Sequence, residues 1–296
     1  MPVLAHVPWQ LRASRLRQQV EVEREAEEIA VAEARRLGAA LALPLGASAL
    51  EAVRRAVENG EAEAAAAAAV PGEVLAAEAE PMLARGVGVG RRMAAVAMPK
   101  RLQRALPDIE VVRPRAARWA AAHAAELVRG VTDETRAGVR AVVARGIAAG
   151  DTPRQIARMI EPVLGLNERQ AASMARAAEI LRKDGTPEPR VLQVVDRRAD
   201  IYRKQRAMLI ARTETFRAVN EGRNDLWQEL VERDLVEAPR VERVWVAAMD
   251  ERTDDICEQL DGERTTLDGE FSGGYSGPPA HILCRCSLVY EEGPTR

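Results

Sequence analysis

The sequence of 296 residues contains few cysteines, few histidines and few aromatic residues. There are three cysteines and three histidines, and Phe, Trp and Tyr together make up 3% of the chain. An odd number of cysteines leaves one thiol outside any set of intramolecular disulfides, which argues against a small secreted domain held together by such bonds. Much of the apolar content is alanine, which favours helix but buries little area. We therefore expect thin helix–helix cores that a partner or other subunits complete.

Long hydrophobic segments are also missing. No run of about 18 apolar residues without charge occurs, so a membrane span is not expected. Residues 1–6 lack the charged start and the apolar stretch of a secretory signal. We therefore expect a reducing compartment, in which thiols stay free or bind a metal.

Charge is unevenly distributed, although its net value is only −2. Residues 112–225 carry more Lys and Arg than Asp and Glu, whereas residues 226–296 carry an excess of acidic residues. The two parts could attract each other, or the basic part could contact the phosphates of DNA or an acidic partner. Solvated helix faces explain much of the same pattern.

The hydrophobic periodicity predicts a mainly helical chain with a small C-terminal β-module, which is an α+β fold in three parts. Residues 1–111 form an extended helical arm with an alanine-rich segment, residues 112–238 a helical domain, and residues 239–296 the β-module. The arm begins with one long helix over residues 10–42, whose narrow apolar stripe is typical of an exposed or coiled-coil helix.

Local signals refine the prediction for the arm. Ser48 and Glu51 have the spacing of a capping box, which predicts a helix over residues 48–59. The alternating glycines from Gly86 to Gly90 match neither of the common phosphate-binding loops, so we predict a hinge or an interface loop there.

In the helical domain, polar residues ahead of apolar periodic segments predict where helices begin. We expect five helices, which begin near residues 115, 132, 153, 168 and 203, and the last of them ends near Leu230. His123 lies on the apolar stripe of the first of these helices, so packing explains it better than metal binding does.

After Pro239 the pattern changes to that of strands. Residues 241–246 and 284–290 are predicted strands, and a long loop connects them. Within the loop, Asp261-Gly262 predicts a turn because glycine tolerates a positive φ. The hydrophobic core of a module of this size is too small to keep it folded, so we expect an additional cross-link between its two strands.

All three cysteines and one histidine fall in a thirty-residue window of this module. They are Cys257, His281, Cys284 and Cys286. Three thiolates and one imidazole complete a tetrahedral shell for zinc and leave no position for a substrate water, so we predict a structural zinc ion that staples the module. The spacing is not that of the common paired zinc knuckles. A disulfide, or cysteines that are simply buried, are the alternatives.

Six short elements of the C-terminal part occur in a recognisable order. They are Ala211-Arg-Thr-Glu-Thr with Asn220, Val244-Trp-Val, Asp250-Glu-Arg-Thr, Leu260-Asp-Gly, Pro278-Pro and Cys284-Arg-Cys. In this order they resemble the phage Mu F-type minor head proteins, also called phage head morphogenesis proteins, over residues 115–292. The resemblance implies a component of a tailed-phage or prophage head that is present in few copies, associates with the portal and is linked to DNA packaging or ejection.

The resemblance also implies which residues belong to the motifs. They are Arg212, Thr213, Glu214, Asn220, Trp245, Asp250, Arg252, Thr253, Asp261 and Gly262, together with His281, Cys284 and Cys286. In relatives the position of Cys257 is commonly a histidine, which also binds zinc. We expect structural roles for the motif residues. Arg212 and Glu214 would form an ion-pair network that docks their helix against Asp250 and Arg252.

From these features we predict a minor capsid or head morphogenesis protein that is not an enzyme. It would be located in the virion, in the head interior or at the portal vertex, after assembly in the host cytoplasm. The portal protein would be its partner, and several copies would be present. Major capsid or scaffold proteins, and packaged DNA through residues 112–225, are further expected contacts. The alternatives are a zinc-containing DNA-binding protein and an enzyme of the ADP-ribosyltransferase or nuclease type.

Overall fold

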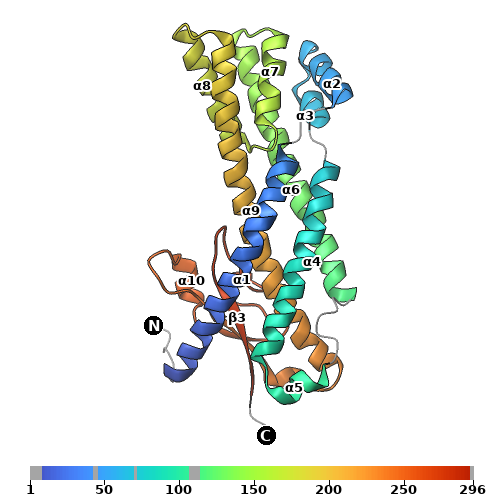
Figure 1. The fold of residues 1–296 in the computed structure, drawn as a ribbon, viewed down its shortest axis with the longest axis vertical. Helices are drawn as coiled ribbons and strands as arrows, with labels where there is room; N and C mark the ends of the chain where they lie inside the picture. Colours follow the sequence, from blue (N-terminus) through green and yellow to red (C-terminus); the bar gives the residue numbers. More distant parts are fainter. Residues whose placement is uncertain (1–8, 43–45, 70–71, 107–113, 294–296) are drawn as a thin grey trace. The chain divides into compact units, whose positions relative to one another are not determined.

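The computed structural model describes residues 9–42, 46–69, 72–106 and 114–293, which are mainly helical and end in a small antiparallel sheet (Figure 1). The predicted α+β class is therefore confirmed. The helices are α1 (Trp9–Leu41), α2 (Ala47–Glu58), α3 (Ala62–Ala68), α4 (Gly72–Ala97), α5 (Lys100–Ala105), α6 (Pro114–Ala149), α7 (Pro153–Val163), α8 (Glu168–Lys183), α9 (Glu188–Glu232) and α10 (Asp255–Leu260). The strands are β1 (Val241–Val246), β2 (Arg264–Thr266) and β3 (Ser287–Glu292). Within these described stretches, no helix combines the length and the apolar character that crossing a bilayer requires.

The described chain forms two compact units, each assembled from separate stretches of sequence. The sheet unit contains residues 1–32, 81–121 and 209–296, and the helical unit contains residues 33–80 and 122–208. Helices α1, α4, α6 and α9 each contribute one part of their length to either unit. This division departs from the predicted boundaries near residues 111 and 238, because long continuous helices carry residues of one element into both units.

In the helical unit, α7, α8 and α9 contribute the buried residues Ile160, Met174 and Val195 to a hydrophobic core. Helix α8 begins at Glu168, as predicted, and Asn167 caps it. Its side chain accepts a hydrogen bond from the backbone N–H of Gln170 at 2.9 Å, and the Gln170 side chain accepts one from the backbone N–H of Asn167 at 3.2 Å. This reciprocal pair satisfies two backbone donors that the helix itself leaves open.

Three helix starts differ from the prediction. Helix α2 begins after Gly46 without a side-chain cap, so the capping box expected at Ser48 is not formed. Helix α6 continues through Thr132, and the neighbouring Thr135 donates its hydroxyl proton to the Val131 carbonyl at 2.8 Å inside the helix. Helix α9 begins at Glu188, well before residue 203. Threonine can bond back to the preceding turn as well as cap a helix, so its presence alone does not mark a helix start.

In the sheet unit, α4 and α9 are in close backbone contact where both carry glycine (Figure 1). A Cβ atom added to Gly90 would overlap the carbonyl of Val219 on α9, and one added to Gly222 would overlap the carbonyl of Val87 on α4. The prediction of a hinge or loop from Gly86 to Gly90 is therefore wrong, because these residues lie inside α4. Glycine weakens a helix by up to about 1 kcal/mol, but here it allows two backbones to approach each other.

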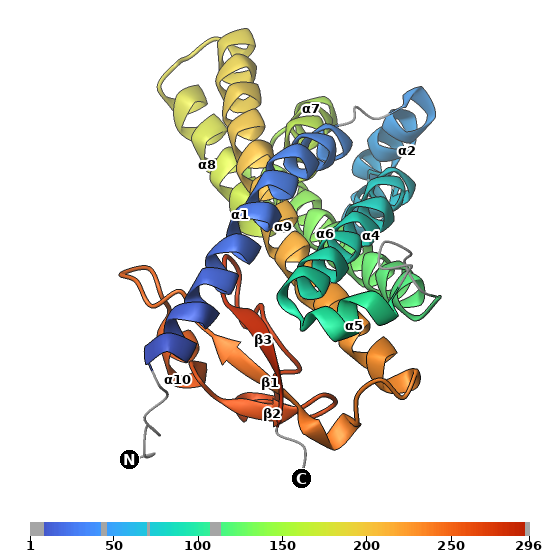
Figure 2. The same ribbon diagram turned by 60° about the horizontal axis from the view of Figure 1, so that its bottom comes forward.

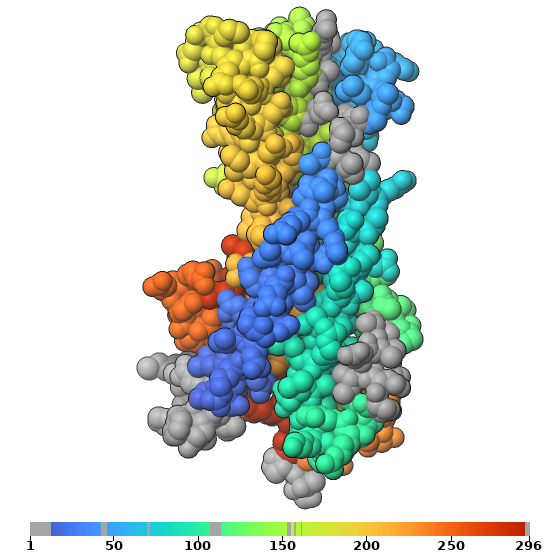
Figure 3. Space-filling model, in the orientation of Figure 1, coloured from blue at the N-terminus to red at the C-terminus, as the bar shows by residue number. Residues whose placement is uncertain are grey.

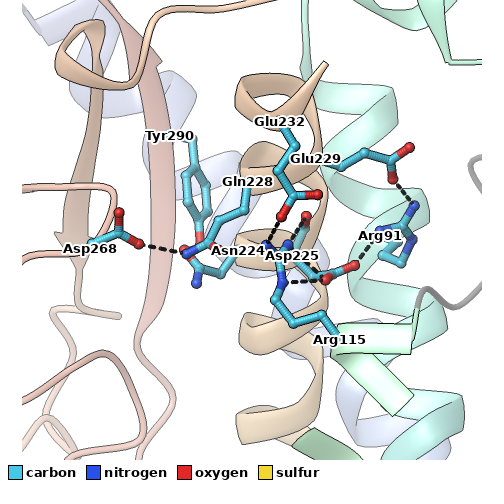
Figure 4. A network of polar contacts seen from close by, with 9 residues as sticks. All are labelled: Arg91, Arg115, Asn224, Asp225, Gln228, Glu229, Glu232, Asp268 and Tyr290. Atoms are coloured by element: carbon cyan, nitrogen blue, oxygen red, sulfur yellow. Dashed lines mark hydrogen bonds and ion pairs between the residues drawn. The ribbon is translucent and has the colours of Figure 1, made fainter. Parts of the chain in front are cut away.

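An ion-pair network that is buried at Arg91 and Asp225 joins α4, α6 and α9 within the sheet unit (Figure 4). Arg91 of α4 is fully buried and pairs with Asp225 and, at 2.6 Å, with Glu229 of α9. Arg115 at the start of α6 lies 2.9 Å from Asp225 Oδ1 and 2.6 Å from Glu232 Oε1. Buried pairs of this kind fix the packing of helices more reliably than they add stability.

Strand β1 is the centre of the antiparallel sheet, whose order is β2-β1-β3 (Figure 2). Arg243 of β1 is buried, and its guanidinium donates hydrogen bonds to the carbonyls of Thr266 at 3.1 Å, of Ser276 at 2.8 Å and of Gly269. One arginine thus holds the loop after β2 against the sheet. Strand β1 agrees with the prediction, whereas β3 begins at Ser287 rather than at Cys284, and α10 and β2 were not expected.

Candidate metal centre

Three cysteine sulfurs lie together in the sheet unit. Cys257 belongs to α10, and Cys284 and Cys286 lie in the segment that leads into β3. All three cysteines are free and buried, and their Sγ atoms lie within 4.8 Å of one another. The structure therefore brings three of the four predicted ligands into an arrangement that could hold a metal ion.

His281 approaches this cluster beside Cys257. Its Nε2 atom lies 3.1 Å from Cys257 Sγ, and its Nδ1 atom lies 2.9 Å from the backbone carbonyl of Ile282. If Nδ1 carries the proton and donates it to this carbonyl, the lone pair of Nε2 faces Cys257. That tautomer is the one in which a histidine can bind a metal through Nε2.

The distances and the charges of the cluster fit a metal ion. In a tetrahedral site with metal–sulfur bonds of about 2.3 Å, two sulfurs lie roughly 3.8 Å apart, and the Sγ atoms of Cys257 and Cys284 are separated by 3.7 Å. A hydrogen bond from Cys286 lowers the pKa of the Cys284 thiol to about 5 and raises the pKa of Cys286 itself. Burial raises the pKa of Cys257 to about 12. Without a cation the cluster therefore favours one thiolate, and a divalent ion would supply the charge that three thiolates need.

Two motif residues of α9 hold the cysteine segment, residues 283–288. Thr213 Oγ1 accepts a hydrogen bond from the backbone N–H of Leu283 at 3.4 Å, and Asn220 Oδ1 accepts one from the backbone N–H of Leu288 at 3.2 Å. Thr213 and Asn220 are both buried and lie about two helical turns apart on one face of α9. The helix thus holds both ends of the segment that carries two of the cysteines.

Asp250 begins a turn that lies against the same segment. Its Oδ1 atom accepts a hydrogen bond from the backbone N–H of Arg252 at 3.0 Å, and Thr253 Oγ1 accepts one from the backbone N–H of Asp250 at 2.9 Å. Arg285, which stands between two of the cysteines, donates to both carboxylate oxygens of Asp250. This guanidinium holds the pKa of Asp250 well below its usual range. The turn is thereby tied to the cysteine segment.

Arg212 and Glu214 do not form the expected network with Asp250 and Arg252. Arg212 Nε lies 2.9 Å from Glu27 Oε2 of α1, and Glu214 Oε2 lies 3.2 Å from Arg217 Nε on the same helix. The predicted docking contact is therefore wrong. Its physical reason is that α1, which is remote in sequence, packs beside α9 and supplies the carboxylate.

The first part of α1 makes further contacts around the site. Gln19 Nε2 donates to the backbone carbonyl of Arg285 at 2.8 Å, and Arg15 Nε donates to Glu291 Oε1 at 2.7 Å. The long helix expected over residues 10–42 is present, but its N-terminal part belongs to the sheet unit. Sequence reasoning missed these contacts. For the ion pairs of α1 with Arg212 and Arg285, the available signal was the acidic run from Glu21 to Glu28, which is opposite in sign to both arginines.

Trp245 is fully buried in the same hydrophobic core as the three cysteines. Its ring meets that of Phe271 edge-on, with 5.2 Å between the ring centroids. The turn expected at Asp261-Gly262 is formed. Asp261 Oδ1 accepts a hydrogen bond from the backbone N–H of Ala247 at 2.9 Å, and Gly262, whose φ is 81°, donates its N–H to the Trp245 carbonyl at 2.8 Å. This turn returns the chain from α10 to the end of β1.

The sequence model of a family described as phage Mu protein F like protein matches residues 137–289, which is more than half of the chain. The matched stretch contains all four predicted metal ligands and the motif residues of α9. No curated protein matches the chain, and no solved structure matches it either.

Proposed function

Because the chain belongs to the phage Mu protein F like family, we propose that it is a phage head morphogenesis protein that docks at the portal of a tailed-phage or prophage-like particle. Membership of the family carries this proposal and indicates an association with the virion. Docking at the portal, assistance in DNA packaging or ejection, several copies in each particle and a non-catalytic role are the finer parts of the proposal.

We further propose that the cluster holds a structural zinc ion, with Cys257, His281, Cys284 and Cys286 as ligands. Zinc suits a tetrahedral set rich in thiolates. The ion would connect α10 to the cysteine segment and so close a module whose hydrophobic core is small. Four protein ligands would leave no coordination position for a substrate, which supports a role in shape rather than in turnover.

Copurification tests both parts of the proposal. The full chain is coexpressed with the portal protein encoded beside it, the complex is isolated, and its metal content is measured by mass spectrometry. We expect a stable complex with one zinc ion for each copy of this chain. The variant Cys286→Ser should lose zinc, whereas Ser276→Ala, on an exposed serine of the same unit, should keep it. Absence of a complex would overturn portal docking, and absence of metal with a bridged pair of cysteines would overturn the zinc site.

Binding of packaged DNA through residues 112–225 stays a prediction. Several arginines of this stretch pair with carboxylates, which reduces the positive charge available to phosphate. Examples are Arg140 with Glu63 and Arg145 with Glu179. A gel-shift series with duplex DNA at increasing salt concentration tests whether the unpaired basic residues still bind phosphate. Phosphate contacts release counterions, so DNA binding through them should weaken as the salt concentration rises.

A further inference from the structure

Arg223 of α9 is buried in the sheet unit, and among the described residues no carboxylate forms an ion pair with it. The residue is 2% exposed, and its Nε and Nη1 atoms have no hydrogen-bond partner among the described residues. The ring of Tyr290, whose centroid lies 6.0 Å from the guanidinium carbon, offers only a weak cation–π contact. Burial lowers the pKa of Arg223 to about 10. The equally buried Arg91 has two carboxylate partners, so Arg223 has an unmet requirement for negative charge.

This guanidinium borders a groove of about 590 Å³ between the parts of α1 and α4 that belong to the sheet unit. Figure 3 shows these two helices side by side on one face of the molecule. Val22, Val89, Met93 and Val96 line the groove, and Val96 is 79% exposed. Of these four residues Met93 and Val96 are accessible, so the groove presents apolar surface beside a buried cation.

The charges around the groove favour a single carboxylate over a polyanion. Arg92 on the rim is exposed, and no ion pair engages it within the described ranges. Glu21 and Glu25 stand on the α1 side of the same groove and would repel a DNA backbone. An acidic side chain could enter between Arg92 and Arg223 while its apolar neighbours cover Met93 and Val96.

We propose that this Arg223 groove, formed by Val22, Val89, Arg92, Met93, Val96 and Arg223, binds an amphipathic helix of the portal protein. The helix inserts an acidic side chain toward Arg223 and packs aliphatic side chains on the groove walls, which is the arrangement of helix-in-groove recognition. The inference rests on the proposed function for the identity of the partner. It adds the surface that is used and the chemistry that is recognised.

The site itself is tested with sodium acetate as a carboxylate probe, independently of any partner. The full chain is labelled with ¹⁵N-arginine, and the side-chain Nε–H signals are followed during the titration, with sodium chloride as the control salt. We expect a saturable shift of one signal that is missing from the spectrum of Arg223→Met. A wild-type signal of Arg223 that does not respond to acetate overturns the carboxylate site.

The partner is tested by measuring the affinity of the purified portal protein for the wild type, for Arg223→Met and for Arg104→Met. Arg104 is exposed on α5 and does not line the groove, so its variant controls for the loss of one positive charge. We expect affinity to fall roughly tenfold or more for Arg223→Met and to stay near the wild-type value for Arg104→Met. The melting temperature of Arg223→Met should be no lower than that of the wild type, because a buried charge without a partner is removed.

The possible failures are distinguishable. If the portal protein binds the wild type and Arg223→Met equally, the groove is not the docking surface, while portal docking itself stands. If the portal protein does not bind the wild type at all, the proposed function fails, and the helix proposal fails with it. A marked drop in the melting temperature of Arg223→Met, with unchanged affinity, assigns Arg223 to the fold and overturns the inference.

Discussion

Asn220 and Leu288 connect α9 to the strand that follows the cysteines. The Asn220 side chain accepts a hydrogen bond of 3.2 Å from the backbone N–H of Leu288, and both residues are buried. Asn220→Ala should lower the free energy of unfolding by about 1–3 kcal/mol, because a buried N–H then loses its acceptor. Urea denaturation followed by circular dichroism measures the change. Asn224→Ala is the control. Asn224 is half-buried one turn further along and accepts a longer hydrogen bond, of 3.4 Å, from the hydroxyl of Tyr290, so equal losses of stability for both variants would contradict this prediction.

Removal of the metal should loosen the cysteine segment without melting the helical unit. A chelator withdraws the ion that compensates three thiolates, and these then take up protons or repel one another. Hydrogen exchange measured by mass spectrometry should show lost protection over residues 283–288, and unchanged protection over α7 and α8. Cys286→Ser should behave like the chelated wild type. Full protection of residues 283–288 in protein proven free of metal would count against a structural ion.

Gly90→Ala and Gly88→Ala should have opposite effects. The added methyl at position 90 overlaps the Val219 carbonyl, so α4 and α9 must move apart, which we expect to lower the free energy of unfolding by about 1–3 kcal/mol. At position 88 the added Cβ meets only the end of the Arg92 side chain, at 3.9 Å. At this position the higher helix propensity of alanine should raise the free energy of unfolding by up to about 1 kcal/mol. Thermal denaturation of both variants shows whether each change raises or lowers stability. A change in the same direction for both variants would argue against the close backbone contact between α4 and α9.

Arg91→Met should be among the most destabilising single changes in the sheet unit. It removes a fully buried partner of Asp225 and Glu229, and breaking a buried pair from one side typically lowers stability by about 3–5 kcal/mol. Arg140→Met breaks the pair with Glu63, whose side chain is 74% exposed, and should lower stability by no more than about 1 kcal/mol. Chemical denaturation of both variants measures the difference. Comparable small losses of stability for both variants would show that the network of Figure 4 tolerates the removal of Arg91.

Glu188 should make stability depend on pH in the acid range. A hydrogen bond from Arg182 lowers the pKa of Glu188, so the folded state binds its proton less readily than the unfolded state does. The resulting stabilisation is present above the unfolded value of about 4.3 and is lost as the pH falls through the lower folded value. Glu188→Gln should remove this part of the pH dependence, a small effect because Glu188 is partly exposed.

The measurement is a series of urea titrations between about pH 3 and pH 7, where the unfolded carboxyl titrates. Glu80→Gln, on an exposed side chain of the same unit, should keep the wild-type pH profile. If Glu188→Gln follows the wild type at every pH, the Arg182 contact does not contribute to folding.

Local signals in the sequence were sufficient for much of the fold and for part of the candidate site. The cap at Asn167, strand β1 and the turn at Asp261-Gly262 follow from backbone preferences and hydrogen bonds that act over a few residues. The gathering of Cys257, Cys284 and Cys286 was predictable for a different reason, since three scarce thiols in one short window are rarely brought together without a common ligand.

Only the tertiary structure decided which faces of these elements meet. Arg212 finds its carboxylate on α1 rather than in the turn at Asp250, and the glycines of α4 contact α9 instead of forming a loop. Arg223 differs from Arg91 only in what surrounds it after folding. Short-range preferences determine whether a segment becomes a helix or a turn, but the partner of a side chain depends on segments remote in sequence, whose packing is decided by burial and charge across the whole unit.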